Sequence, residues 1–424
     1  MKRRRWNLSG SSMLYSLMIS LLVSALLGAY LLADASLRQL STRVYGQGRA
    51  EDNLRSAVET ALNAAEVQDD WSDFEWMAEE DTMSAYWERW GAFGLLHAEG
   101  RHFRFRDRKS FLVGRELRDQ KTALVLSDEG LPLVLTGQSR IKGSIHIPEG
   151  TLRLEGWQGQ KEEIVIRRSK RLRATDYPSI PEWIKSVLGQ NIQRVSSAVV
   201  WAPSENVRTD NWREEAIEIG KEGRIILNGG TYSGKILIHA NDKIEVRPNT
   251  QLEDVILIAP KILIRAGTKG RFQAFAGDSL WLEEGVKLEF PSLVAVCDQQ
   301  EGQAYLHIDT SCRIEGAVLY YNPYLSNAPS TIRPQVMIRE ESSIYGTVHV
   351  AGNLSLKGVV NGQVITQGFV LRTEVGTVRN HLRDAQLNRD RLAPAYAGPF
   401  LEKTGPLRPL RIFDHETKVL AKWE

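Results

Sequence analysis

Residues 244–286 contain three copies of one pattern: Ile244-Glu-Val-Arg-Pro-Asn-Thr, Ile262-Leu-Ile-Arg-Ala-Gly-Thr and Leu280-Trp-Leu-Glu-Glu-Gly-Val. Each copy is an apolar-x-apolar run that leads into a turn, which is typical of a short β-strand. The distance in sequence from the first copy to the second equals that from the second to the third. Two further series have the same spacing: Val246, Ile264, Leu282 and Leu257, Phe275, Leu293.

A period of about 18 residues predicts a β-solenoid (β-helix), in which stacked coils bury a continuous apolar row. The fold class that we expect is therefore mainly β, with the solenoid over residues 126–376 and an insertion at about 160–215. A charged residue follows each strand and should face outward. These residues are Arg247, Arg265, Glu283, Asp309 and Arg339. The alternative is a β-sandwich, which has frequent strands but no constant spacing between equivalent positions.

The N-terminus has the features of a membrane anchor. Residues 1–12 form a basic stub with Lys2, Arg3, Arg4 and Arg5. Residues 13–33 follow without a single Asp, Glu, Lys or Arg. As a transmembrane helix they would be about 32 Å long, enough for a bilayer core of about 30 Å. The positive-inside bias places the stub in the cytoplasm and the body outside it. The alternative is a cleaved signal peptide, because Ala33-Asp34-Ala35 has the pattern of a cleavage site.

Small residues recur at every fourth position in this region: Ser12, Ser16, Ser20, Ser24 and Gly28. On a helix they share one face, where a second helix can approach closely. We expect Ser16, Ser20, Ser24 and Gly28 to pack against another membrane helix, from a second copy or from a different membrane protein. The alternative is that Ser and Gly are simply common in membrane helices.

Residues 34–125 are expected to form a helical and aromatic region outside the cytoplasm. Leu54, Val58 and Leu62 have the spacing of one helix face. The acidic and aromatic residues 67–93 are expected to be a helical subdomain that packs onto the solenoid. The alternative is that their Trp side chains are exposed and stack on sugars or peptides.

Two later segments also have helical patterns. The run from Pro178 to Leu188 predicts a short helix with Pro near its start. It follows a basic cluster at 167–173, which we expect to be a solvated edge; the alternative is contact with phosphates or anionic glycans. The tail, residues 377–424, is expected to contain a helical stretch from His381 to Arg391 and a strand at 411–413.

Two resemblances to known families accompany these patterns. Residues 1–66, with Ser9-Gly-Ser-Ser-Met-Leu-Tyr-Ser-Leu before the span, resemble minor-pilin-like pilus-assembly proteins. The chain departs from them at Tyr15, five residues after Gly10, where prepilins have Glu. The motifs Ile141-Lys-Gly-Ser-Ile-His-Ile and Ile344-Tyr-Gly-Thr-Val-His-Val resemble bactofilins, which are polymer-forming bacterial β-helix scaffolds. The second resemblance implies a structural role without catalysis.

The chemistry-bearing motifs that we sought are absent from the sequence. It has no phosphate-binding Gly-rich loop, no Gly-x-Ser-x-Gly elbow and no His-Glu-x-x-His. We therefore expect no catalytic residue, no cofactor and no metal site. His146 and His349 recur in the two similar motifs and predict a repeat position. Cys297 and Cys312 can form one disulfide or remain two free thiols.

These patterns predict a non-enzymatic protein of the bacterial inner membrane, with its N-terminus inside and its body outside the cytoplasm. We expect a structural or assembly role in a pilus-like or secretion-like machine, as a homo-oligomer or with other membrane proteins. The net charge of +2 gives no reason to expect nucleic acid. The alternative is a membrane-tethered protein that binds or acts on polysaccharide.

Overall fold

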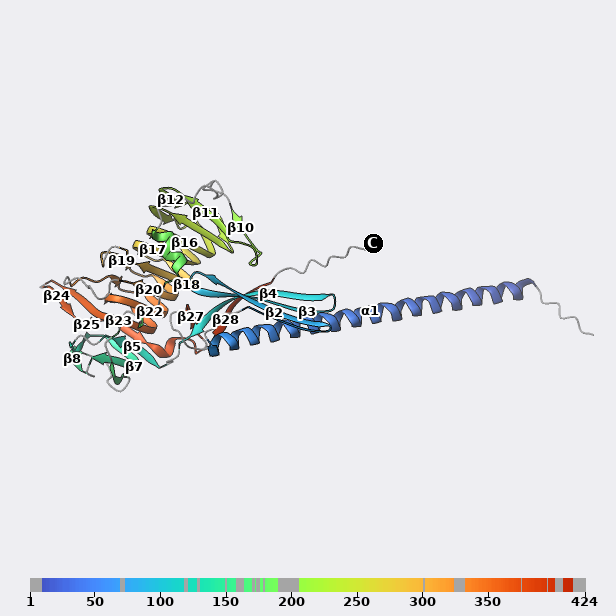
Figure 1. Ribbon diagram of the computed structural model, residues 1–424, viewed down its shortest axis with the longest axis horizontal. Coiled ribbons are helices and arrows are strands. Elements are labelled where there is room, and N and C mark those ends of the chain that lie inside the picture. Colours follow the sequence, from blue (N-terminus) through green and yellow to red (C-terminus); the bar gives the residue numbers. More distant parts are fainter. Residues whose placement is uncertain are drawn as a thin grey trace, which may run out of the picture.

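The protein consists of a mainly β body and a long N-terminal helix that extends away from it (Figure 1). The structure is a computed structural model. It describes residues 10–68, 73–117, 121–127, 130–148, 151–157, 164–169, 172, 176–177, 180–189, 206–299, 302–323, 332–374, 376–394, 396–400 and 407–414.

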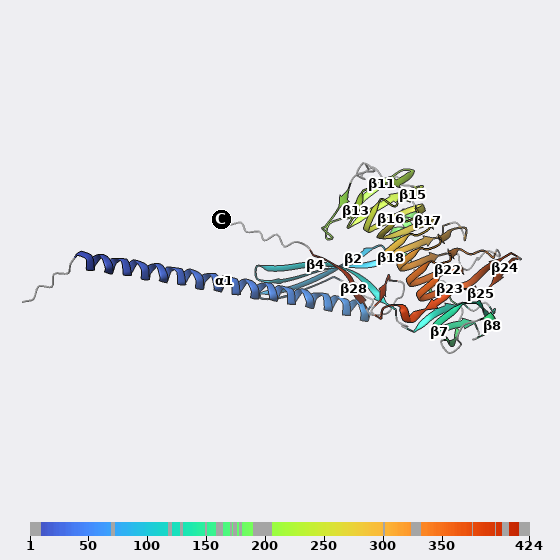
Figure 2. The same ribbon diagram turned by 180° about the vertical axis from the view of Figure 1, so that it is seen from behind.

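Helix α1 (Gly10–Gln68) is 59 residues long and unbroken, so its axis measures about 88 Å. It contains the expected membrane span and continues through Ala33-Asp34-Ala35 into the helical region predicted after it. Its first half stands clear of the body and its second half lies along a small sheet (Figure 2). Gly46 lies under the ring of Phe105, so closely that any larger side chain would collide with that ring.

The small sheet is antiparallel and is built from β1 (Phe74–Ala78), β2 (Asp81–Trp90), β3 (Phe93–His102) and β4 (Phe105–Glu116). Two strands from the other end of the chain, β27 (Ala397–Gly398) and β28 (Leu407–Asp414), both pair with β4. The sequence prediction of a strand at 411–413 is therefore confirmed.

The prediction of a helical subdomain at 67–93 is wrong, because its described part forms strands β1 and β2. The physical reason is the period of two in this segment. Ala85 and Trp87 face α1 from β2, whereas Tyr86 and Glu88 face the opposite side and contact His97.

The second half of α1 covers one face of this sheet. Leu54 and Val58 pack with Ala57, Ala61 and Ala65 against the strands, as the helical spacing predicted. Small residues allow the two backbones to come close, and Gly100 of β3 lies directly against the helix backbone at Ala50 and Leu54. The helix and the sheet therefore form one packed unit.

A large array of parallel strands makes up the rest of the body. In chain order the strands are β5 (Thr122–Leu126), β6 (Leu133–Gly137), β7 (Arg140–Pro148), β8 (Leu152–Trp157), β9 (Ile164–Ser169), β10 (Val207–Arg208), β11 (Ile217–Lys221), β12 (Arg224–Leu227), β13 (Thr231–Ser233), β14 (Ile236–Ala240), β15 (Lys243–Val246), β16 (Gln251–Ile264), β17 (Lys269–Leu282), β18 (Lys287–Cys297), β19 (Tyr305–Ile308), β20 (Arg313–Tyr321), β21 (Val336–Ile338), β22 (Ser343–Leu356), β23 (Val359–Thr373), β24 (Gly376–Arg379), β25 (His381–Arg383) and β26 (Gln386–Asn388). Apart from the antiparallel pair β23–β24, the described pairings within the array are parallel, which excludes the sandwich alternative.

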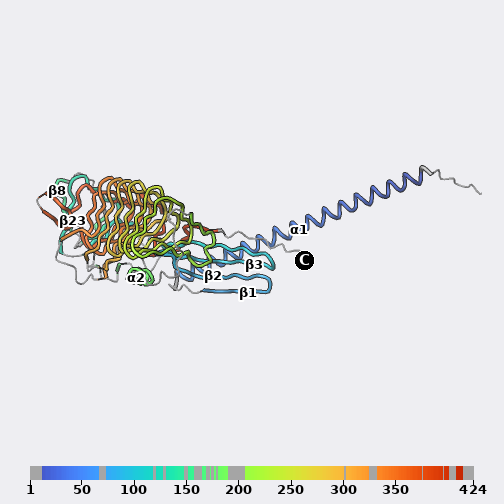
Figure 3. The backbone as a smooth tube through the Cα atoms, turned by 90° about the horizontal axis from the view of Figure 1, so that it is seen from above, coloured from blue at the N-terminus to red at the C-terminus, as the bar shows by residue number. Residues whose placement is uncertain are grey.

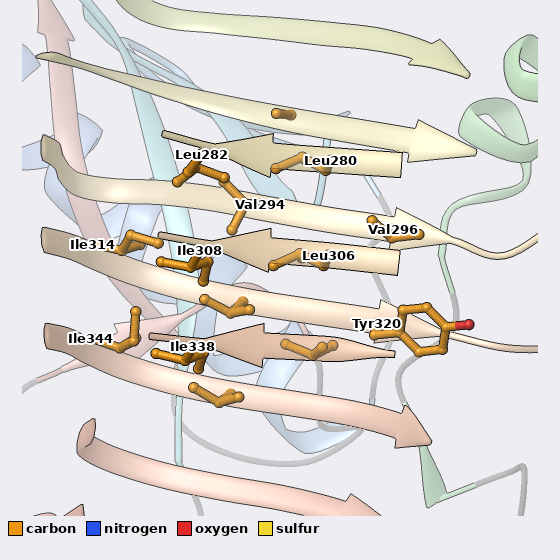
Figure 4. Packing of buried hydrophobic residues seen from close by; sticks show 14 of the residues in the cluster. Leu280, Leu282, Val294, Val296, Leu306, Ile308, Ile314, Tyr320, Ile338 and Ile344 are labelled. Carbon is orange, nitrogen blue, oxygen red and sulfur yellow. The ribbon is translucent and has the colours of Figure 1, made fainter. Parts of the chain in front are cut away.

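The register of the array confirms two of the three predicted series. Ile244 pairs with Ile262, which pairs with Leu280, and Val246, Ile264 and Leu282 are aligned in the same way. These side chains point into the interior, where apolar residues of successive layers pack into one continuous core (Figure 4).

The third series is not in register, because a β-bulge at Asp254 shifts the pairing. Glu253 pairs with Arg271, but Val255 already pairs with Phe272. Leu257 therefore pairs with Ala274 and faces the interior, while Phe275 faces outward. The extra residue at Asp254 cannot be recognised from the sequence, because the spacing of the apolar residues stays constant across it.

The order of the layers differs from the order of the chain. The array starts at β10 and continues to β23, which then pairs with the much earlier strand β5; β7 and β9 follow to the far end. The chain returns from β9 to β10 through a connection that contains α2 (Glu182–Gly189), the helix predicted near Pro178 to Leu188. Helix α2 lies beside the stacked strands (Figure 3), where Ile184 and Leu188 pack in one apolar cluster with Phe275.

Two segment predictions need correction. The insertion expected at about 160–215 contains array strands β9 and β10 as well as α2. The stretch from His381 to Arg391 is not a helix but forms β25, β26 and a single 3-10 turn. Its apolar residues Leu382 and Leu387 enter the array core, and this burial outweighs helix propensity.

Candidate functional site

The first half of α1 is the most unusual surface of the described chain. Its apolar side chains are exposed, with Leu21 at 68%, Tyr30 at 70% and Leu32 at 72%. By length and composition, α1 is long and apolar enough to cross a membrane. A soluble monomer rarely exposes an apolar surface of this size.

The residues of the predicted packing stripe lie on this half. Ser20 and Ser24 are exposed, and nothing lies within 4 Å of the position that a Cβ atom on Gly28 would take. The hydroxyl of Ser16 donates a hydrogen bond to the carbonyl oxygen of Met13 at 3.0 Å. Lys2, Arg3, Arg4 and Arg5 lie outside the described residues.

The joint between the small sheet and the array is held by the turn between β2 and β3. The side chain of Gln273 donates to the carbonyl of Trp90 (2.9 Å) and accepts from the amide of Ala92 (2.8 Å). The indole of Trp90 donates to the carbonyl of Asp254, at the bulge. Trp212 packs edge-on against Trp90. These contacts fix the array to the sheet.

An ion pair between a buried lysine and a partly exposed glutamate crosses the same joint. The ammonium group of Lys235 is 2% exposed and lies 2.6 Å from the carboxylate of Glu88, with the carbonyls of Trp212 and Glu214 also in reach. Burial alone would raise the pKa of Glu88, but hydrogen bonds from His97 and Lys235 outweigh it and lower that pKa. Burial also lowers the pKa of His97.

Sequence reasoning missed this joint. The one available signal was Lys235, a charged residue next to the apolar strand β14. Nothing in the sequence pairs it with Glu88, 147 residues earlier.

One face of the array bears the predicted charged ladder. In each layer the backbone N–H of the ladder residue donates a hydrogen bond to a carbonyl oxygen of the preceding layer. This holds in succession for Arg265, Glu283, Asp309 and Arg339. The guanidinium of Arg265 reaches the Glu283 carboxylate at 2.8 Å. The expected outward placement of this ladder is confirmed by the partial exposure of these side chains.

An aromatic row runs beside the charged ladder. Trp281 pairs in register with Leu263 on one side and His307 on the other, and the rings of Trp281 and His307 are 4.8 Å apart. Trp281 is 40% exposed and Tyr305 is 38% exposed.

The disulfide between Cys297 and Cys312 is not formed. Both thiols are free and buried, Cys312 in the array interior and Cys297 in the apolar cluster outside it. The two sulfur atoms therefore lie on opposite sides of the strand layer. Burial raises the pKa of both thiols, that of Cys312 to about 11.

His146 and His349 occupy equivalent positions, as the repeat predicted. His349 pairs with Ile365, which pairs with Val125, which pairs with His146. Burial lowers the pKa of His349 to about 3, so that its ring is neutral. Among the residues that the structure describes, no three His, Cys, Asp or Glu side chains are grouped so that they could hold a metal ion.

No family model and no curated protein matches the chain, so the resemblance to bactofilins gains no support. Among solved structures, the crystal structure of competence-associated pilin ComZ from Thermus thermophilus is weakly similar. The match has a TM-score of 0.20 and 11% sequence identity, and covers 89% of this chain and 95% of that chain. These values are too low to establish a shared fold, so the proposals below rest on the contacts within this chain.

Proposed function

We propose that this chain is a non-enzymatic structural protein of the bacterial envelope, anchored by α1 and joined through it to a pilus-like or secretion-like assembly. One observation carries the proposal. The second half of α1 is packed on a sheet, while the first half exposes an apolar surface that water cannot solvate favourably. Lipid and other helices are the surroundings that suit such a surface.

We place the anchor in the inner membrane, with the basic stub in the cytoplasm and the body outside. The charges of the stub support this orientation through the positive-inside bias. The unbroken helix through Ala33-Asp34-Ala35 favours a retained anchor over a cleaved signal.

The array is proposed to be a β-solenoid with a period of about 18 residues per coil. In support, strands β15, β16 and β17 pair in parallel, and the offset between partners is constant over Ile244, Ile262 and Leu280. A rigid stack of this kind suits a platform or spacer.

The anchor is tested by separating membranes from cells that express the full chain and extracting them at alkaline pH. We expect the chain to stay with the membranes, and external protease to reach the body only after the outer barrier is opened. A chain that is released by alkaline extraction would contradict the proposal.

The predicted packing stripe is tested with the double variant Ser20→Leu/Ser24→Leu in a membrane-helix association reporter. We expect loss of association, because two Leu side chains keep the backbones apart. Ala25→Leu/Ala29→Leu adds the same kind of bulk to another face of the helix and serves as the matched control. Equal association in both variants would contradict a role for the stripe.

A second candidate function is glycan binding, favoured by the exposed rings of Trp281 and Tyr305 in neighbouring layers. Aromatic rings of this kind can stack on sugar rings. Binding of surface polysaccharide that is lost in Trp281→Ala and kept in Ile412→Ala, at an exposed apolar residue of β28 in the small sheet, would support it.

A further inference from the structure

The exposed part of α1 has a second apolar face that lies outside the membrane span. Leu37, Leu40 and Val44 are 65%, 59% and 63% exposed. The residues between and around them are mostly polar, and Asp34 forms an ion pair with Arg38 at 2.8 Å. Charges at this level of the helix place it in water, so lipid does not cover these three side chains.

These side chains continue a heptad pattern that begins inside the span. The spacing alternates between three and four residues along the series Ile19, Val23, Leu26, Tyr30, Ala33, Leu37, Leu40 and Val44. A period of about 3.5 residues is the seam of a left-handed coiled coil. Inside the span most positions are apolar, so the stretch after Ala33 carries the inference.

The part of the body that the structure describes does not cover this seam. At about 100° per residue, the seam lies about a quarter turn from the face on which Leu54 and Ala61 meet the sheet. The seam also ends at Val44, two residues before Gly46, where Phe105 at the tip of the β3–β4 hairpin reaches the helix. A second helix therefore has room along the seam.

We propose that this seam binds the same helix of a second copy of the chain, as a parallel, in-register pair outside the membrane. The proposal rests on the function proposed above, because an anchor gives both copies the same orientation. Outside the span, Val44 at an a position and Leu40 at a d position are the combination that favours two strands. The a positions are Val23, Tyr30, Leu37 and Val44, and the d positions are Ile19, Leu26, Ala33 and Leu40.

Charge is compatible with this pairing. In a parallel pair, the g positions of one helix face the e positions of the other. Ser36 would then face Ser41, and Arg43 would face Gly48, so no two like charges meet. The seam also differs from the small-residue stripe, which lies about a third of a turn away on the same helix. Pairing through the seam would leave Ser20 and Ser24 free for another partner.

The experiment is disulfide trapping of the full chain in membranes. Leu40→Cys places a thiol at a d position, and Thr42→Cys places one on the side of the helix away from the seam. Both positions are exposed, and the native Cys297 and Cys312 are buried in the body. On mild oxidation we expect a band of twice the chain mass with Leu40→Cys and none with Thr42→Cys or the unmodified chain.

Each other result overturns the proposal. Equal trapping in both variants would indicate random collision. A band of another mass with Leu40→Cys would show that a different protein occupies the seam. If Leu40→Cys is not trapped although the chain remains in the membrane, pairing through the seam is refuted and the proposed anchor is unaffected. Loss of the unmodified chain from the membrane would instead refute the proposed function.

Discussion

Gly346 offers a direct test of how tightly the layers of the array are stacked. It pairs with Gly316 in the preceding layer and with Gly362 in the next, and its φ is +146°. A Cβ atom on Gly346 would lie 2.6 Å from the hydroxyl of Tyr396 and closer still to the carbonyl oxygen of Gly316. Real Cβ contacts below 3.0 Å are essentially never seen, so either the layers must separate or the backbone must shift.

The variant Gly346→Ala should therefore be destabilised in two ways. Overpacking costs about 1–3 kcal/mol, and a non-glycine residue at this φ costs about 1–3 kcal/mol more. For a cooperative unit of roughly 250 residues, about 1 kcal/mol lowers the melting temperature by about 2 °C. We expect a decrease of about 4–12 °C.

The assay is thermal unfolding of the detergent-solubilised full chain, followed by the circular dichroism of the β-strands. Gly267→Ala is the matched control, because Gly267 also has a positive φ (+72°) but has open space where its Cβ would be. That variant should lose only the part due to φ, about 2–6 °C. If the two variants melt within about 1 °C of each other, the close contact between layers is refuted.

The buried joint and the two thiols give further predictions. Lys235→Met removes the cation beside the partly exposed Glu88 and leaves the buried carbonyl of Trp212 without its lysine donor. A buried acceptor left without a donor costs about 1–3 kcal/mol, so limited proteolysis between sheet and array should be faster; an unchanged cleavage rate would refute this. Folding lowers the pKa values of His97 and Glu88, so their contribution to the free energy of unfolding is fully present above about pH 6.5. As the pH falls below about 6.5 the protonation of His97 reduces this contribution, and below about pH 4.3 the protonation of Glu88 reduces it further. A urea midpoint that stays level from about pH 7 to about pH 4 would contradict this prediction. Cys297 and Cys312 should react with a thiol reagent only after unfolding, and reaction of the folded chain would show that they are accessible.

The repeat of the array could be predicted from sequence because its layers obey one local rule. A residue such as Ile262 must face the same interior as Ile244 and Leu280, so burial fixes their spacing. The helix face of Leu54 and Val58 was predictable for a similar reason. Both patterns reflect periodic burial of apolar side chains.

The rest depends on contacts between distant segments. The bulge at Asp254 adds one residue without changing the apolar spacing, so Leu257 and Phe275 seemed equivalent. No local pattern encodes the pairing of β5 with β23 or the hydrogen bond from Gln273 to Trp90, because both join residues that are far apart in sequence. Strands β1 and β2 were missed because aromatic and acidic side chains alternate there on two faces that are both partly covered.

The return of the chain from β9 to β10 has a consequence for how such a body can change length in evolution. The chain enters the array after β4 and leaves it before β27, and the pairing of Glu116 with Ala397 keeps these two points together whatever the number of layers in the stack. The connection that contains α2, however, joins opposite ends of the stack. Each added layer of strands would raise the stack by about 4.8 Å and require one or two more residues in that connection at about 3.3 Å per residue. Growth by whole layers should therefore be accompanied by small, matched insertions at a remote place in the gene.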